Sequence, residues 1–266
     1  MTPEAAGHDL SEWLEELEAS HRHLQALADP LDERAIGQPS YCDGWSIADV
    51  LSHLGSGAEI FEALLAAACA GRPAPGHDVF EEAWARWDAM NPAEKSRHWQ
   101  TADATLLEAM GTLTADQRHD LRFTLGPMEL DAAGLARLRL SEHAVHAWDV
   151  AVALDPSARI PSSAVALLLD GLGAIAERAG RTDGSNRSWL VRTAAPTRDV
   201  ALLDTERLAL RVDPATRADG RNLDLELPAE ELVRLVYGRL DDEHRGSLPI
   251  EQESVLHHLQ HLFPGF

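Results

Sequence analysis

The chain has 266 residues, of which 23 are lysine or arginine and 44 are aspartate or glutamate, so its formal net charge is −21 at neutral pH. That excess of acidic groups argues against binding to nucleic acid or to an anionic membrane surface, because both are themselves negatively charged. With 45% apolar and 25% charged residues, the composition is that of a folded globular protein with enough apolar material for a sizeable core.

The sequence carries no signal for export or membrane insertion. Residues 1–9 have no basic segment followed by an apolar run, and the longest apolar stretch, residues 63–70, is far shorter than the roughly 20 residues needed to cross a bilayer. Cys42 and Cys69 are the only cysteines in a chain too large to need disulfides, which is typical of a reducing compartment. We therefore expect a cytoplasmic protein.

The first part of the chain has the pattern of amphipathic helices. In residues 9–28, for example, apolar residues recur at spacings of three, four and seven. Ser46 with Asp49 three residues later is typical of a helix start, and Asn91-Pro92 is expected to kink or break the third helical region, because proline removes an interior donor. Four helices with modest connections predict a four-helix bundle. They are expected at residues 9–28, 46–70, about 79–113 and about 128–154.

The composition changes after a fifth expected helix, residues 162–179. Residues 180–188 are polar and rich in turn-forming residues, and short segments of strand length follow. We therefore predict a mainly α domain, residues 1–180, a linker at about 181–188 and a small α+β domain, residues 189–266. Strands are expected at residues 189–193, 200–203, 208–212 and 223–227, and helices at 229–237 and 251–262.

The clearest chemistry lies in the fourth helical region. Glu142 and His146 are four residues apart, so on a helix they lie about 40 degrees apart around the axis, and both can point at one atom. His143 is about 100 degrees from Glu142 and is expected to point elsewhere. His53, in the middle of the second helix and near its buried face, is the best candidate for a third ligand. A His, Glu, His set with one open position is the ligand pattern of catalytic zinc.

The same residues also allow a plainer interpretation. A Glu–His pair at this spacing is most often a solvated pair that adds a few tenths of a kcal/mol to a helix, and a lone histidine such as His53 is more often a core residue than a ligand. Asp49, four residues before His53, and Asp149, three residues after His146, are each placed to accept the second ring N–H of a ligand.

Two tryptophans and one cysteine also lie in or near these motifs. Trp45 and Trp148 are expected to be core anchors, since large aromatic side chains bury much apolar area; lining a pocket is the less favoured alternative. Cys42 has no evident base paired with it, so the sequence gives no support for a nucleophilic role.

Two motifs carry a resemblance to a known family. Residues 43–54, DGWSIADVLSHL, together with residues 142–149, EHAVHAWD, resemble the mycothiol-dependent maleylpyruvate isomerase family, a branch of the DinB-like four-helix-bundle superfamily. Residues 227–240 look like the family's C-terminal domain, a small α+β unit similar to sterol-carrier folds, in which a Gly-Arg pair ends a helix. The family's metal is zinc, and the resemblance assigns its ligands to His53, Glu142 and His146.

The resemblance implies a zinc-dependent enzyme whose open metal position takes mycothiol, a low-molecular-weight thiol, as cosubstrate. The thiolate would add to a small electrophile, and the product would be either a cis-trans isomer, as in maleylpyruvate isomerisation, or a lasting thioether, as in S-transferases. Arg239 is the catalytic candidate outside the bundle, because a guanidinium can hold a carboxylate or stabilise an enolate-like charge. The sequence is equally consistent with Arg239 as a surface residue whose positive charge interacts favourably with the C-terminal end of the helix dipole.

Two other functions stay open at this point. A metal-dependent hydrolase would use water in place of the thiol and would turn over without it. A non-catalytic protein would bind an apolar ligand in its C-terminal domain. On the leading hypothesis the partners are mycothiol and a small electrophile, with neither nucleic acid nor membrane; the oligomeric state is not readable from the sequence.

Overall fold

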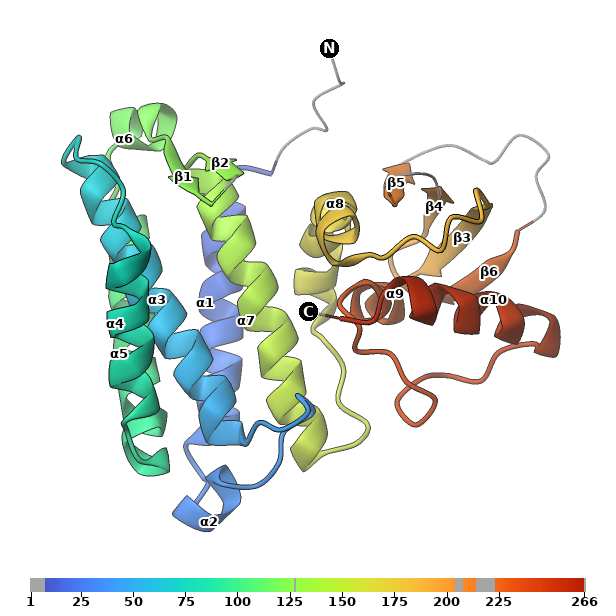
Figure 1. The fold of residues 1–266 in the computed structure, drawn as a ribbon, viewed down its shortest axis with the longest axis horizontal. Coiled ribbons are helices and arrows are strands. Elements are labelled where there is room, and N and C mark those ends of the chain that lie inside the picture. The colour runs from blue at the N-terminus through green and yellow to red at the C-terminus, as the bar shows by residue number, and fades with distance from the viewer. Residues whose placement is uncertain (1–7, 127, 204–207, 214–222, 266) are drawn as a thin grey trace. The chain divides into compact units, whose positions relative to one another are not determined.

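Four long helices form the core of the first of two units, Met1–Arg159 (Figure 1). The computed structural model describes residues 8–126, 128–203, 208–213 and 223–265. Within this unit α3 packs most extensively on α5, and α1 on α7. The expected helical bundle is therefore confirmed. Its helices are α1 (Leu10–Ala28), α3 (Ile47–Cys69), α5 (Pro92–Gly111) and α7 (Ala132–Leu154).

Side-chain caps fix where the bundle helices begin. Ser46 and Asp49 form a reciprocal capping box at the start of α3, as the sequence predicts. Asn91 caps α5 and Pro92 occupies its first turn, where the missing N–H would have no helical partner. Asn91-Pro92 therefore separates α5 from α4 (His77–Asp88) and does not kink a single long helix.

The last bundle helix begins later than the sequence predicts. Residues 128–130 form strand β2 (Met128–Leu130), which pairs antiparallel with β1 (Phe123–Leu125), and α7 starts after Asp131, whose side chain accepts from the Gly134 N–H. The expected start at residue 128 was wrong because a three-residue strand is too short to show a period of its own. Two short helices, α2 (Glu33–Ile36) and α6 (Ala115–Asp120), were also not expected.

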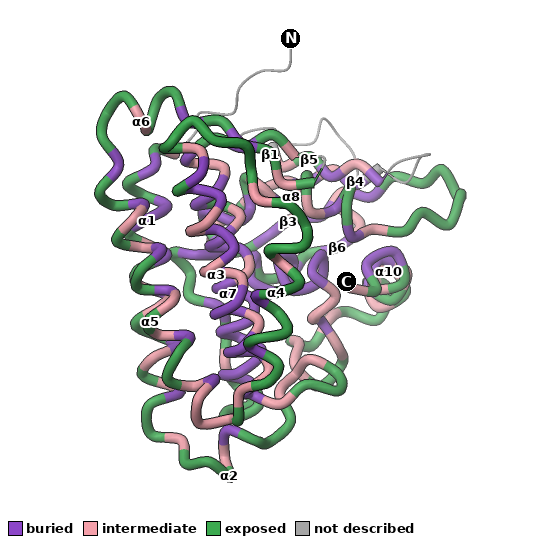
Figure 2. The backbone as a smooth tube through the Cα atoms, turned by 60° about the vertical axis from the view of Figure 1, so that its left-hand side comes forward, coloured by how far each residue is buried: buried purple, intermediate pink, exposed green. Residues whose placement is uncertain are grey.

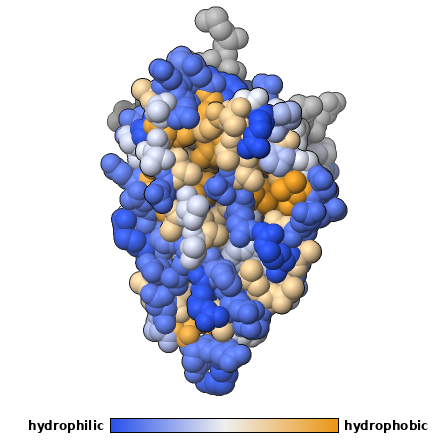
Figure 3. Space-filling model, turned by 90° about the vertical axis from the view of Figure 1, so that its left-hand side faces the viewer, coloured by the Kyte–Doolittle hydropathy of each residue, from blue (hydrophilic) through white to orange (hydrophobic). Residues whose placement is uncertain are grey.

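Burial follows the helix faces that the apolar pattern indicates. Buried residues, purple in Figure 2, run along α3 and α7. The face drawn in Figure 3 is mostly hydrophilic with apolar patches between, and the exposed large apolar side chains of the protein include Val79 and Trp84 of α4. None of the helices described here is both long and apolar enough to span a membrane.

The second unit, Ile160–Phe266, is an α+β unit. Its four-stranded sheet has the order β5-β4-β3-β6, in which β3 pairs antiparallel with β4 and parallel with β6, and β4 pairs antiparallel with β5. All four expected strands are present within a few residues of their predicted bounds. The elements are α8 (Ser162–Ala179), β3 (Ser188–Ala194), β4 (Arg198–Leu203), β5 (Ala209–Asp213), β6 (Leu225–Pro228), α9 (Ala229–Val236) and α10 (Ile250–Leu262).

The division between the units differs from the linker expected at residues 181–188. It falls before Ile160, so α8 belongs to the second unit, where it packs on α9 and β5. The close approach of α8 to β5 depends on Gly173, because an ideal Cβ there would lie 2.6 Å from the Leu210 carbonyl oxygen. A polar, turn-rich segment marks a loop, but it does not show which unit the preceding helix packs against.

Gly55 of α3 offers a test of this packing. An ideal Cβ there would overlap the six-membered ring of Trp87, whose side chain is buried in the core. We expect Gly55→Ala to lower the midpoint of urea unfolding, because overpacking typically costs about 1–3 kcal/mol, more than the roughly 1 kcal/mol by which alanine favours a helix. Gly111→Ala is the control, since no described atom outside its own helix neighbourhood lies within 4 Å of its ideal Cβ. A G55A protein as stable as the parent would contradict the packing described.

Candidate metal centre

Three side chains from two helices of the bundle converge on one point. His53 Nε2 of α3 lies 3.2 Å from Glu142 Oε2, and His146 Nε2 lies 3.7 Å from the same oxygen. One ligand atom from each of the three residues lies within 4.8 Å of the other two. Glu142 and His146 share one face of α7 because they are one helical turn apart, and α3 brings His53 to that face. The structure therefore brings together the three residues that the sequence singles out.

The three side chains are unequally exposed. His146 is 10% exposed, whereas Glu142 is 27% and His53 39% exposed. One donor is thus anchored in the core, and the other two are partly exposed. Such a cluster can take a metal ion whose remaining coordination position is reachable by a small molecule.

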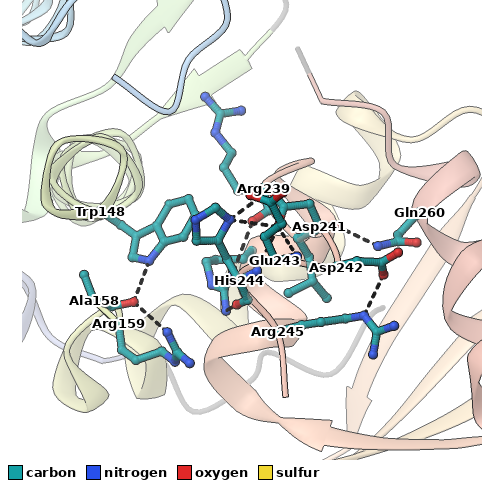
Figure 4. Close-up of polar contacts among 12 residues, drawn as sticks. Trp148, Ala158, Arg159, Arg239, Asp241, Asp242, Glu243, His244, Arg245 and Gln260 are labelled. Carbon is teal, nitrogen blue, oxygen red and sulfur yellow. Dashed lines mark hydrogen bonds and ion pairs between the residues drawn. The ribbon is translucent and has the colours of Figure 1, made fainter. Parts of the chain in front are cut away.

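Trp45 flanks this cluster and does not lie in the core. Its side chain is 39% exposed, and its ring lies 5.4 Å from the His53 ring and 6.3 Å from the His146 ring, nearly parallel to the latter. The expectation of a core anchor was therefore wrong for Trp45, because its position just before α3 places it at the edge of the bundle. For Trp148 it is confirmed: the ring is buried and its Nε1 donates to the Ala158 carbonyl oxygen (Figure 4).

The carboxylate of Glu142 is held in its ionised form. Burial by itself raises its pKa, but the hydrogen bond with His53 and the electrostatic interactions with His146, His53 and Arg139 outweigh burial and lower the pKa to about 2. Glu142 can therefore act as a metal ligand at neutral pH without losing a proton.

Of the two aspartates considered as supports, Asp149 contacts a ligand. His146 Nδ1 lies 2.8 Å from Asp149 Oδ2, and this carboxylate is fully buried. Such a contact fixes the tautomer and leaves Nε2 available to a metal. Asp49, by contrast, accepts from Ser46 and from Lys95 Nζ, so it serves the start of α3.

Cys42 also touches this support. Its Sγ donates to Asp149 Oδ2 at 3.0 Å and lies 3.9 Å from His146 Nδ1. Sequence reasoning missed the contact because the two residues stand 107 positions apart, with no local pattern to link them. Since His146 already uses the same carboxylate oxygen, the arrangement makes Cys42 a second donor to Asp149.

His143 points away from the cluster, as its helical offset predicts. Its Nδ1 lies 2.9 Å from Ser20 Oγ, and its Nε2 lies 3.1 Å from Asp103 Oδ2. His21, Asp103 and His143 are close enough to hold a metal ion by distance alone. The Arg139 guanidinium, however, is hydrogen-bonded to the same Asp103 carboxylate, and its positive charge would repel a second cation.

Arg239, the catalytic candidate outside the bundle, lies in the second unit directly after Gly238. Gly238 has a φ of 69°, and an ideal Cβ there would overlap the backbone of Gly265, so the Gly-Arg pair ends α9 in a turn that requires glycine. Arg239 Nη1 donates to the Tyr237 carbonyl oxygen, and its own carbonyl accepts from Arg234 Nη1 (Figure 4 shows the segment from Arg239 onward).

Fold and donor set together define a class: a helical bundle with a His, Glu, His cluster, followed by a small α+β unit. The family model described as the mycothiol maleylpyruvate isomerase N-terminal domain matches residues 17–151, just over half of the chain, including all three donors. The protein therefore belongs to the mycothiol maleylpyruvate isomerase family.

Solved structures show the same fold. The chain is similar to a crystal structure of the mycothiol-dependent maleylpyruvate isomerase and to one of a mutant in which a histidine is replaced by alanine. For each, the TM-score is 0.64 and the identity 18%, over 88% of this chain and 91% of that chain. None of the curated proteins matches the chain.

The shifted pKa of Glu142 makes stability depend on pH. A carboxyl with an ordinary pKa of 4.5 and a folded-state pKa of about 2 stabilises the fold above pH 4.5, and this contribution is lost as the pH falls from about 4.5 towards 2. Without metal, Glu142→Gln should lose less stability than the parent between about pH 6 and pH 3, as measured by urea unfolding at each pH. Glu129→Gln, an exposed control, should follow the parent. Equal losses in the parent and E142Q would contradict the assignment.

The contrast between the two aspartates gives a second prediction. Asp149→Asn should weaken zinc binding about 10- to 100-fold, because supports of this kind orient the ligand ring. Asp49→Asn disturbs the start of α3 and the ion pair with Lys95 but no donor of the cluster, so its zinc affinity should equal that of the parent. Competition against a chromophoric chelator measures both, and equal affinities in the two variants would argue against a role for Asp149.

Proposed function

We propose that this protein is a zinc-dependent enzyme that activates the thiol of mycothiol for addition to a small electrophilic substrate. The observation that carries the proposal is the convergence of His53, Glu142 and His146. Two imidazole nitrogens and one carboxylate oxygen are a typical donor set for catalytic zinc. Membership of the family and the name of its solved relatives support mycothiol as the thiol.

The residues present fit such a site. A zinc ion held by these donors would lower the pKa of a thiol in the open position, whereas a free thiol, with a pKa of about 8.5, is mostly protonated at neutral pH. His53 and His146 contribute neutral donors, and Glu142 contributes a single negative charge. The centre would therefore keep one net positive charge with which to hold a thiolate.

The surrounding side chains have supporting roles in this proposal. Asp149 holds the His146 ring, and Trp45 lies beside the rings of both histidines. Arg239 is proposed to hold a substrate carboxylate or to stabilise the enolate-like charge that develops when a thiolate adds to an activated double bond. A maleylpyruvate-like acid has both a carboxylate and an activated double bond.

Isomerase and S-transferase share these residues and differ in the fate of the adduct. If the bond to sulfur breaks after rotation about the former double bond, the product is a cis-trans isomer and the thiol is released unchanged. If the bond persists, the product is a thioether. Mass analysis of a mixture of enzyme, mycothiol and candidate electrophile distinguishes the two outcomes. We propose mycothiol and a small electrophile as the partners, and the cytoplasm as the location.

Zinc content tests the metal centre directly. Protein purified without chelator or nickel should hold about one zinc per chain, and His53→Ala, Glu142→Ala and His146→Ala should each lose it while remaining folded. His98→Ala, an exposed histidine on α5, is the matched control and should keep the metal. Elemental analysis and circular dichroism provide the measurements.

Two other results would favour the alternative functions. Zinc-dependent turnover without added thiol would indicate a hydrolase. A parent protein that takes up no metal after reconstitution would overturn the enzyme proposal and favour a protein that binds an apolar ligand in its α+β unit.

A further inference from the structure

We infer that Arg139 is a positioning residue of the metal centre: its guanidinium joins α3 to α7 beside the three donors and thereby sets the separation of His53 from Glu142. The inference rests on the proposed function only in treating those donors as metal ligands. No local pattern marks Arg139, since its partners come from distant parts of the chain.

The first link runs to the backbone of α3. Arg139 Nη2 donates to the Leu54 carbonyl oxygen at 2.8 Å. Leu54 directly follows His53, and Arg139 stands three residues before Glu142, within one helical turn. The hydrogen bond therefore connects the backbone next to one donor with the turn of α7 that carries another. A change in this contact would alter the distance across the site.

The second link fixes the guanidinium itself. Arg139 Nε and Nη2 both donate to Asp103 Oδ1 of α5, at 3.2 and 2.5 Å, and both side chains are almost fully buried. The other oxygen, Oδ2, lies 2.7 Å from His21 Nδ1 of α1. Charged hydrogen bonds of this kind are strong and directional. The Arg139 side chain of α7 is therefore held from α3 and α5, and its partner Asp103 is held in turn from α1.

Gly57 provides the space that the guanidinium needs. An ideal Cβ at Gly57 would lie 3.3 Å from Arg139 Nη1, tighter than an ordinary van der Waals contact. Glycine is a poor helix former in the middle of a helix, and α3 nevertheless has it where it faces Arg139. The absent side chain at Gly57 and the bond to Leu54 together define one position for the guanidinium.

The test compares zinc affinity in the parent with Arg139→Met, Arg139→Lys and Gly57→Ala, by chelator competition without thiol. We expect at least a tenfold loss in R139M and a smaller loss in R139K, because one ammonium cannot reproduce the fork of a guanidinium. G57A should lose affinity several-fold although alanine favours the helix. Arg137→Met, an exposed arginine on the same helix, is the control and should bind like the parent.

A second measurement separates this inference from the proposed function. In metal-free protein, the ring resonances of His53 should shift in R139M and G57A but not in R137M. Unchanged His53 resonances together with parental zinc affinity in G57A would overturn the inference, even if R139M were less stable or failed to fold. A parent without zinc affinity would overturn the proposed function, and the His53 resonances would still decide the role of Arg139.

Discussion

A charged pair in the centre of the helical bundle is the constraint on which the first unit depends. Arg139 and Asp103 are both removed from water, and burying two charges is costly unless they are paired and their remaining donors and acceptors are also satisfied. Here they are satisfied by partners from other helices of the bundle, α1, α3 and α5. We interpret the pair as specifying how the helices align more than as adding to their stability.

The buried Arg139 also influences the candidate metal centre. Arg139 lies close enough to help keep Glu142 ionised, and the two neighbouring histidines act in the same direction. On the other side of His146, Asp149 accepts from the imidazole and from Cys42. Asp149 thus orients the His146 ring from behind, as the proposed metal centre would require if its geometry is to exist before the metal binds.

Local patterns made much of this predictable, and long-range contacts explain what they missed. The spacing of Glu142 and His146 is a property of one helix, and the apolar neighbours of His53 place it near the bundle interior, so these residues could be singled out. Asp103 and Cys42 meet their partners only after folding. The exposure of Trp45, the β1-β2 hairpin and the packing of α8 on β5 likewise depend on which surfaces meet, and periodicity carries no such information.

The second unit also contains a buried arginine that is paired with a carboxylate. Arg234 is fully buried, pairs with both oxygens of Glu230, and donates to the carbonyl oxygens of Arg239 and His244. In both units, then, a buried arginine is neutralised by a carboxylate and uses its remaining N–H groups on backbone next to a candidate functional residue. Because a guanidinium has five donors in a rigid fork, it can do both at once with fixed geometry, which a lysine ammonium on its flexible stem reproduces less well. The orientation of the backbone at Arg239 is therefore a consequence of the core, just as the separation of His53 and Glu142 is in the bundle.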